Sequence, residues 1–358
     1  MLWLEGVKMK KICSLLLSLC LIVSIFSLQG CNKKTDLKKF TDYSFDFFDT
    51  VTTIIGYEKN EKTFKANCEV IKNELMRYHK LYDIYTEYDG INNLCSLNKK
   101  KGGLHSKLLV DTEIVSLLNF SKEIYEKTFG KVNVAFGNVL SLWHEERTYG
   151  IKYPEKAKLP DEKKLKAAAE HTDISKIIIE TDSVFIEDNE MTLDVGAVAK
   201  GYATEKVAEF MMKKGFKSYL LNVGGNVRAL SPQPDGKKWK IGIENPDTDD
   251  QDNPYIEYLE LSDMSLVTSG SYHRFYTVNG KNYNHIIDTD SLMPAENFTS
   301  VSVICKSSAL ADAFSTALFC MSLEDGKKLA RLEKFEAMWV LKNGKQVYTD
   351  NFKSYCTK

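Results

Sequence analysis

At the centre of the chain stands Asp194-Val195-Gly196-Ala197-Val198-Ala199-Lys200-Gly201-Tyr202-Ala203, which combines a carboxylate, two glycines, three alanines and one lysine. Glycine and alanine let a ligand approach the backbone closely because they carry no large side chain. Beyond this stretch, apolar residues recur at helical spacing and a glycine stands where the helix would end: Ala199, Ala203, Val207, Phe210, Met211 and then Gly215. The pattern predicts a helix whose N-terminus follows Asp194.

A helix N-terminus presents free N–H groups and the positive end of the helix dipole, so it can bind an anion. Lys200 would add a positive charge in the first turn of this helix. An ordinary amphipathic helix, capped and packed through small residues, has the same pattern. The stretch alone therefore leaves a ligand site and a purely structural helix both open.

Composition places the chain among ordinary globular proteins. It has 358 residues, of which 43% are hydrophobic and 27% charged, enough for one large domain or two modest ones. The formal net charge is -1, so nothing in the charge balance suggests a nucleic-acid partner.

The N-terminus has the pattern of a targeting segment. Basic residues precede an apolar run over 12–28 that is too short and too early to predict a membrane span. The run ends in Leu28-Gln29-Gly30-Cys31, which resembles a bacterial lipoprotein signal and implies cleavage before Cys31 with lipid on its thiol. A plain signal peptide or an N-terminal helix anchor is the alternative, and Met9 is a second candidate start.

This interpretation divides the chain into a signal peptide over 1–30, a polar tether over 31–42 and one domain over 43–355. The expected location is the extracytoplasmic face of a bacterial cell membrane, with the protein held by its lipid. Five of the eight cysteines lie beyond the lipidation site, an odd number without CxxC spacing: Cys68, Cys95, Cys305, Cys320 and Cys356. They predict neither a disulfide framework nor a zinc site.

The remaining pattern mixes helices with β-hairpins. Apolar periodicity predicts helices over 61–81, 111–128 and 307–321. β-Branched and aromatic runs predict strands over 47–55, 176–179, 184–186, 218–223, 227–230 and 239–243, with a turn at Gly224-Gly225-Asn226. Residues 82–98 are expected to form a loop. Such a mixture indicates an α+β fold and not a regularly alternating parallel sheet.

Three further stretches could carry chemistry. In Thr268-Ser269-Gly270-Ser271-Tyr272-His273-Arg274, the arginine or the histidine could meet a phosphate, although a solvated hairpin edge would look the same. In His285-Ile286-Ile287-Asp288, alternation places His285 and Ile287 on one face of a strand. On a helix, Asp312, Ser315 and Thr316 share one oxygen-rich face, which suits magnesium but is also common on ordinary helices.

Taken in order, these motifs resemble the ApbE family of FAD:protein FMN transferases. The matching pattern runs Asp-x-Gly-x-x-Ala-Lys-Gly-Tyr-Ala, Asn-Val-Gly-Gly-Asn, Thr-Ser-Gly-x-Tyr, His-Ile-Ile-Asp and Ala-Asp-Ala-x-Ser-Thr-Ala. Residues 48–52 look like the family's opening strand, and 137–143 look like its Gly-Pro-Leu-Val-Asn-Leu-Trp motif. The resemblance covers nearly all of the chain after Cys31, and it implies an ApbE-like, T-fold-like arrangement of mixed sheets and helices with an FAD cleft between two subdomains.

The resemblance also implies a reaction and its residues. Magnesium-dependent transfer of FMN from FAD to a threonine or serine hydroxyl of a partner flavoprotein would release AMP. By position, the FAD site would be lined by Phe48, Lys131, Val132, Asn133, Asp194, Lys200, Ile287 and Asp288. Magnesium would be held by the Ala197 carbonyl, Asp312 and Ser315 or Thr316, on a cleft wall outside the core. The catalytic candidates are His285 for acid–base help, Lys200 and Asp312.

One residue and two stretches depart from the family pattern. Ala197 stands where a glycine is frequent, which does not matter if only its carbonyl binds metal. Lys131-Val132-Asn133 stands where an alanine-phenylalanine-aspartate triplet is usual, and 289–294 differs from the usual Pro-x-Thr-Gly-x-Pro except at Pro294. An FAD pyrophosphatase on the same scaffold, in which water replaces the protein hydroxyl, would share the site residues. A lipid-anchored protein that only binds flavin is a third possibility, although it would not need an oxygen-rich metal face.

Overall fold

The computed structural model describes residues 36–100, 107–247, 249–250 and 252–357, so the predicted signal peptide and Cys31 lie outside the described residues. Its main feature is an eight-stranded sheet in the order β1-β2-β6-β7-β10-β13-β14-β15, with every neighbouring pair antiparallel. The strands are β1 (Lys38–Phe47), β2 (Thr50–Glu58), β6 (Tyr219–Val223), β7 (Asn226–Leu230), β10 (Ser265–Gly270), β13 (Phe298–Cys305), β14 (Glu336–Leu341) and β15 (Gln346–Tyr348).

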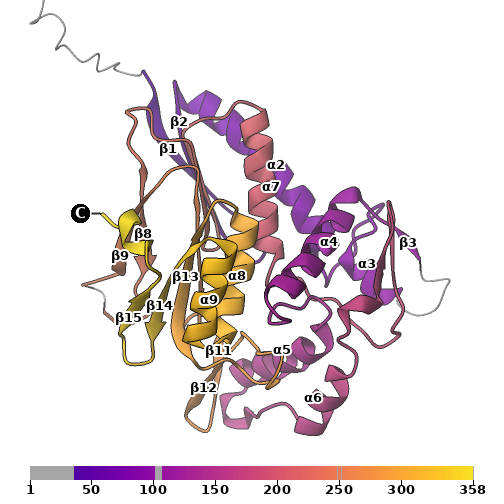
Figure 1. Cartoon of the computed structure of the whole chain (residues 1–358). Coiled ribbons are helices and arrows are strands. Elements are labelled where there is room, and N and C mark those ends of the chain that lie inside the picture. Colours follow the sequence, from indigo (N-terminus) through magenta and orange to yellow (C-terminus); the bar gives the residue numbers. More distant parts are fainter. Residues whose placement is uncertain (1–35, 101–106, 248, 251, 358) are drawn as a thin grey trace, which may run out of the picture.

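Helices cover one face of this sheet (Figure 1). They are α2 (Glu61–Tyr82), α7 (Ala199–Lys213), α8 (Ser308–Cys320) and α9 (Leu323–Glu333). The side chains of Asn60 and Ser307 cap α2 and α8 by accepting N–H groups of the first turn. Apolar side chains of α2, α7 and α8 join those of the sheet in the largest buried cluster of the described chain. The helices predicted over 61–81 and 307–321 are confirmed.

The opposite face is covered by a hairpin of β8 (Trp239–Glu244) and β9 (Tyr255–Leu261), followed near the C-terminus by η3 (Phe352–Tyr355). In β8, Trp239, Ile241 and Ile243 are buried while the residues between them are not, as their alternation predicted. These side chains pack with Phe352 against the second face of the large sheet. The sheet therefore has an apolar layer on both faces.

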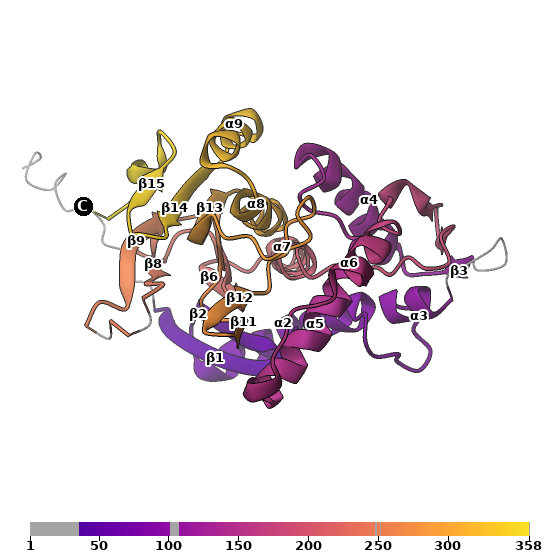
Figure 2. The same cartoon turned by 90° about the horizontal axis from the view of Figure 1, so that it is seen from below.

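A second unit is built from smaller elements beside the helical layer (Figure 2). It contains α3 (Leu94–Lys99), α4 (Thr112–Lys127), α5 (Gly137–Lys152), η1 (Pro154–Lys156), α6 (Glu162–Ala169), η2 (Ile174–Lys176) and a sheet of β3 (Leu108–Leu109), β5 (Ser183–Ile186) and β4 (Ile177–Ile179). The hairpin of β11 (Phe275–Val278) and β12 (Lys281–Asn284) packs on α5 through Trp143, Tyr276 and Val278. Mixed sheets and helices confirm the predicted α+β class.

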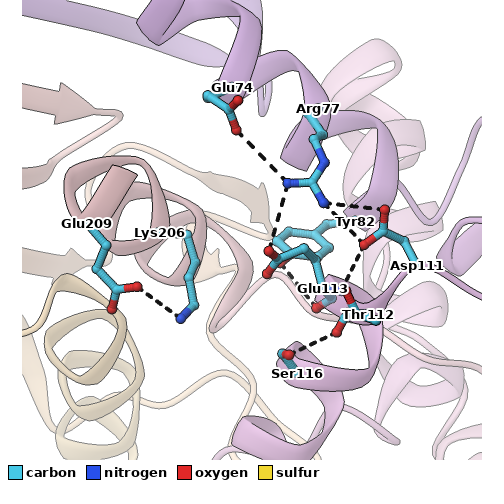
Figure 3. A network of polar contacts seen from close by, with 9 residues as sticks. All are labelled: Glu74, Arg77, Tyr82, Asp111, Thr112, Glu113, Ser116, Lys206 and Glu209. Carbon is cyan, nitrogen blue, oxygen red and sulfur yellow. Dashed lines mark hydrogen bonds and ion pairs between the residues drawn. The ribbon is translucent and has the colours of Figure 1, made fainter. Parts of the chain in front are cut away.

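Polar contacts join α2 to α4 (Figure 3). The Arg77 guanidinium contacts the carboxylates of Glu74, Asp111 and Glu113, and Tyr82 donates to the Glu113 carbonyl. A surface hollow of about 470 Å³ is lined by Arg77, Asp111 and residues around β3, and it contains none of the predicted site residues. No helix among the described residues is long and apolar enough to cross a membrane.

The N-terminal part differs from its prediction in two ways. Residues 38–42, expected to belong to a polar tether, are the first half of β1. The strand predicted over 47–55 is interrupted at Phe48 and Asp49, whose φ angles of 53° and 49° form a turn between β1 and β2. Residues 82–98, expected as a loop, contain the start of α3 because Asn93 and Ser96 form a capping box.

Candidate active site

Asp312 lies between α7 and α8 and is the best-connected carboxylate of the predicted site. It is 4% exposed, which corrects its expected place on an open cleft wall. One carboxylate oxygen accepts the Gly201 backbone N–H at 2.7 Å, and the other lies 3.6 Å from Lys200 Nζ. Burial raises the pKa of Asp312, while the Lys200 charge and the Gly201 N–H act in the opposite direction.

Glycine at 201 is required by this contact. A Cβ at this position would lie 2.3 Å from Asp312 Cβ and 2.5 Å from the Ser308 carbonyl oxygen. The helix begins at Ala199 without a side-chain cap, so the Asp312 carboxylate supplies one of the acceptors that its first turn lacks. The anion predicted at this N-terminus is therefore, in part, a residue of the chain itself.

The Ala197 carbonyl does not accept the amide that a continuing helix would direct to it. A longer helix would direct the Gly201 N–H to the carbonyl four residues earlier, but this N–H goes to Asp312. Among the described residues, no backbone amide outside the helices and strands donates to Ala197. Asn226 lies 1% exposed beside Asp312, and its Oδ1 has no hydrogen-bond partner in the described chain.

Ser315 and Thr316 are placed differently. Ser315 Oγ is buried, donates to the Asp312 carbonyl at 2.9 Å and lies 2.8 Å from Ser269 Oγ. Thr316 Oγ1 is 3.3 Å from the same carbonyl, and its side chain is partly exposed. Within the described residues no three His, Cys, Asp or Glu side chains converge as a metal-ligand group. A metal ion at this position would therefore be coordinated by one carboxylate, by neutral oxygens of the protein and by oxygens of the bound substrate.

His285 follows β12 and lies among cations. Its Nδ1 is 3.2 Å from the Arg274 carbonyl, which can only accept, so Nδ1 carries the proton and Nε2 of the neutral ring is free to accept one. Burial, then the charges of Arg274, Arg147 and Lys200, lower the pKa of His285 to about 3. The ring is consequently neutral near pH 7.

Asp194 precedes the helix without capping it. Its Oδ1 accepts the Gly196 N–H at 2.8 Å, and its own N–H donates to the Val134 carbonyl at 2.9 Å. Burial raises the pKa of Asp194, and the Gly196 N–H and the Arg147 charge partly oppose this effect. The residue thus connects the segment before α7 with the segment that contains Lys131, Val132 and Asn133.

Those three residues are occupied by contacts within the protein. Lys131 Nζ lies 2.5 Å from Asp288 and 2.7 Å from Asp290, so its charge is compensated by the loop after β12. Val132 is buried. The Asn133 amide donates to the Thr172 carbonyl and accepts the Ala135 N–H. Lys131 and Asp288, which were both predicted to line the flavin site, are therefore neighbours that form an ion pair with each other.

The remaining flavin candidates lie at two turns. Phe48 occupies the tip between β1 and β2, where its N–H is 3.3 Å from His79 Nδ1 and its ring meets the His79 ring edge-on. Ile287 is 6% exposed and pairs with Pro294, so the proline retained from the family pattern closes this loop.

Sequence reasoning missed two neighbours of these residues. Arg147 on α5 acts on both Asp194 and His285, and Asn226 adjoins Asp312. Asn226 belongs to the Asn-Val-Gly-Gly-Asn motif, so its position could have been singled out. Arg147 lies in a helix rich in charged residues and carries no local signal.

Solved structures share this architecture. The ApbE protein of Thermotoga maritima superposes with a TM-score of 0.76 at 25% identity, covering 90% of this chain and 100% of that one. The flavin transferase ApbE of Vibrio cholerae has a TM-score of 0.72 at 22% identity, covering 89% and 99%. The fold is thus of the class found in ApbE-type proteins.

Sequence comparison identifies the family within this class. The ApbE family model matches residues 48–339. A protein of Treponema pallidum named FAD:protein FMN transferase is 31% identical over 258 residues, covering 68% of either chain. One of the same name from Vibrio cholerae is 25% identical over 340 residues, covering 94% of this chain and 95% of its own. The chain belongs to the ApbE family.

Proposed function

We propose that the protein is a magnesium-dependent FAD:protein FMN transferase. The reaction breaks the pyrophosphate of FAD, attaches FMN to a threonine or serine hydroxyl of an acceptor flavoprotein and releases AMP. The observation that carries this proposal is the junction of α7 and α8, where the Ala197 carbonyl and the Asp312 carboxylate adjoin Lys200. Support also comes from the names of the relatives and from the motifs that the chain shares with the family.

The residues present fit a magnesium ion. Asp312 and the Ala197 carbonyl are hard oxygen donors, and the partnerless Asn226 Oδ1 shows that polar capacity beside Asp312 is unused. Thr316 is a better third donor than Ser315, because Ser315 is fully buried and shares its hydroxyl with Ser269. Magnesium, when bound, would offset negative charge on the phosphoryl oxygens.

Lys200 and His285 have separate tasks in this proposal. Lys200 places a positive charge 3.6 Å from Asp312, where it can contact a phosphoryl oxygen of FAD. His285 keeps Nε2 unprotonated near neutral pH and can accept the proton of the acceptor hydroxyl as the oxygen attacks phosphorus. Its proton acceptance would be favoured once the anionic pyrophosphate lies among the surrounding cations.

We infer from the N-terminal sequence where in the cell the reaction takes place. Lipid on Cys31 would hold the enzyme at the extracytoplasmic membrane face, which suits an acceptor that is itself exported or membrane-bound. FAD and this acceptor are the proposed partners.

One incubation separates the transferase from its two rivals. The full chain is mixed with FAD, magnesium and a candidate acceptor, and the products are resolved by denaturing electrophoresis with flavin fluorescence and by nucleotide chromatography. Covalent FMN on the acceptor with equimolar AMP is expected. Free FMN plus AMP without labelled acceptor would instead indicate an FAD pyrophosphatase, and intact FAD would indicate a flavin-binding protein.

A further inference from the structure

Two arginines of the described chain have no carboxylate partner. Arg77, Arg228 and Arg331 each form ion pairs with acidic side chains. Arg147 on α5 and Arg274 before β11 form none within the described residues. Arg147 is half-buried, and a charged side chain partly withdrawn from water is normally paired, because desolvation without compensation costs free energy; Arg274 is exposed.

The face of α5 that packs on the β11–β12 hairpin includes Arg147. Trp143, Arg147 and Gly150 lie at helical positions i, i+4 and i+7, so they share one face of α5. The Trp143 ring stacks on Tyr283 with centroids 6.4 Å apart, and a Cβ at Gly150 would be 2.8 Å from the Tyr276 ring.

These two tyrosines place α5 relative to Arg274 and His285. Tyr283 is two residues before His285, and Tyr276 is two residues after Arg274, so the contacts of α5 lie close in sequence to both residues. Arg147 stands on α5 between the two contact points. Because α5 packs against this hairpin (Figure 2), the charges of Arg147 and Arg274 both act on the His285 ring.

A local contact orients the Arg147 side chain without neutralising it. Arg147 Nη2 lies 3.0 Å from His144 Nδ1, which accepts from the guanidinium. Burial, then the Arg274 charge, lowers the pKa of Arg147, whereas Asp194 and two tyrosines act in the opposite direction. Asp194 already accepts the Gly196 N–H, and Arg274 has only its carbonyl engaged, by His285. The pair thus retains positive charge that no ion pair within the described residues neutralises.

We propose that Arg147 and Arg274 form a phosphoryl-binding site beside His285, which takes the non-bridging oxygens of a diphosphate group. The planar guanidinium can bind two such oxygens at once, and two guanidinium groups match the two phosphates of a diphosphate. The assignment of this diphosphate to FAD rests on the proposed function. Arg147 then fixes the phosphate that leaves with AMP or the one that is transferred, while Lys200 and Asp312 act from the α7–α8 side.

The test uses inorganic pyrophosphate titrated calorimetrically into the full chain, without magnesium, at low ionic strength. Arg147→Gln is expected to weaken pyrophosphate binding by about tenfold or more, since it removes charge-assisted hydrogen bonds. Arg147→Lys should retain part of the affinity, and Arg274→Gln should match Arg147→Gln. Arg331→Gln, at a distant exposed ion pair, is the matched control and should bind as the wild type does.

Wild-type affinity in Arg147→Gln, with circular dichroism unchanged, would overturn the site. Equal binding of succinate and pyrophosphate by the wild type would also overturn it, because a general anion patch would then suffice. Failure of the two proposals is distinguishable. If pyrophosphate binding depends on the arginines but the chain transfers no FMN, the phosphoryl-binding site stands and the transferase proposal is refuted. If Arg147→Gln transfers FMN and binds FAD normally, the transferase proposal stands and the phosphoryl-binding site is refuted.

Discussion

Asp312 serves both the packing of α7 and the proposed metal, and two substitutions separate these roles. Asp312→Asn keeps an oxygen that can accept the Gly201 N–H, so the fold should survive while magnesium-dependent activity is lost. Asp312→Ala leaves that buried N–H without an acceptor and should cost a further 1–3 kcal/mol, to order of magnitude, in the free energy of unfolding. Urea unfolding and a magnesium titration of activity measure the two effects. A normal magnesium response in Asp312→Asn would place the metal elsewhere.

His285 makes stability depend on pH. Its pKa falls from 6.5 to about 3 on folding, so below pH 6.5 the unfolded chain takes up a proton that the folded chain does not. The folded state therefore has its full stability, as far as His285 is concerned, above about pH 6.5. It loses stability progressively as the pH falls from there toward 3. His285→Asn should therefore lose less stability than the wild type between pH 7 and pH 4 in thermal unfolding. Parallel pH profiles for the two proteins would contradict a depressed histidine pKa.

At the residue scale, spacing identified the groups that belong to motifs. Lys200 and Asp312 come together as expected, because a helix start and a polar helix face both have readable patterns. The contacts that Lys131 and Asn133 make within the protein could not be predicted, since their partners Asp288 and Thr172 are distant in sequence. Arg147 was missed for the same reason: its role depends on how α5 packs.

At the scale of elements, the contact between α7 and α8 depends on Gly201. Gly201→Ala would place a methyl group 2.3 Å from Asp312 Cβ and 2.5 Å from a backbone oxygen, so the helices must separate. We expect a loss of about 1–3 kcal/mol in unfolding free energy, together with weaker magnesium-dependent activity. Gly326→Ala is the control, because its nearest contacts are 3.1 Å away and belong to side chains. Equal effects of the two substitutions would argue against a special α7–α8 contact.

Helices with a long apolar period were predictable, and so were strands in β-branched runs, down to the three residues of β4, whereas the start of β1 and the helix α3 were not. The periods of α2, α4, α7 and α8 extend over three or more turns, and the Gly224-Gly225 turn has the positive φ angles that glycine favours. The first half of β1 is Lys-Lys-Phe-Thr-Asp on an edge strand, and this mostly polar composition is also that of a tether. The six-residue α3 depends on one capping box, too little for a periodic signal.

For the whole molecule, the α+β class followed from the mixture of elements, but the strand order did not. Neighbours such as β2 and β6 are separated by more than a hundred and fifty residues, and no local pattern encodes which edges pair. The resemblance to the ApbE family predicted mixed sheets packed with helices and gave no strand order. The apolar layer under β8 and β9 likewise becomes evident only once both faces of the sheet are assembled.

Attachment to the membrane is a property of the whole chain and has its own test. Cys31→Ala should remove the lipid acceptor and release the protein from the membrane fraction, with FMN transfer to a soluble acceptor unchanged. Metabolic labelling with a fatty-acid probe and fractionation measure this, and Cys68→Ala, at a buried thiol in the folded domain, is the matched control. Undiminished labelling of Cys31→Ala would contradict the lipoprotein signal.

The tip between β1 and β2 has a consequence for evolution and engineering. Phe48 and Asp49 are both held at positive φ, where a sequence selected for stability alone would place Asn-Gly. Asp49→Gly should therefore raise the melting temperature with little effect on FAD affinity. Phe48→Asn should relieve the same backbone strain yet weaken FAD binding, measured by flavin fluorescence. If both hold, natural variation at this turn reports on the ligand, and thermostability screens would tend to select against the enzyme's affinity.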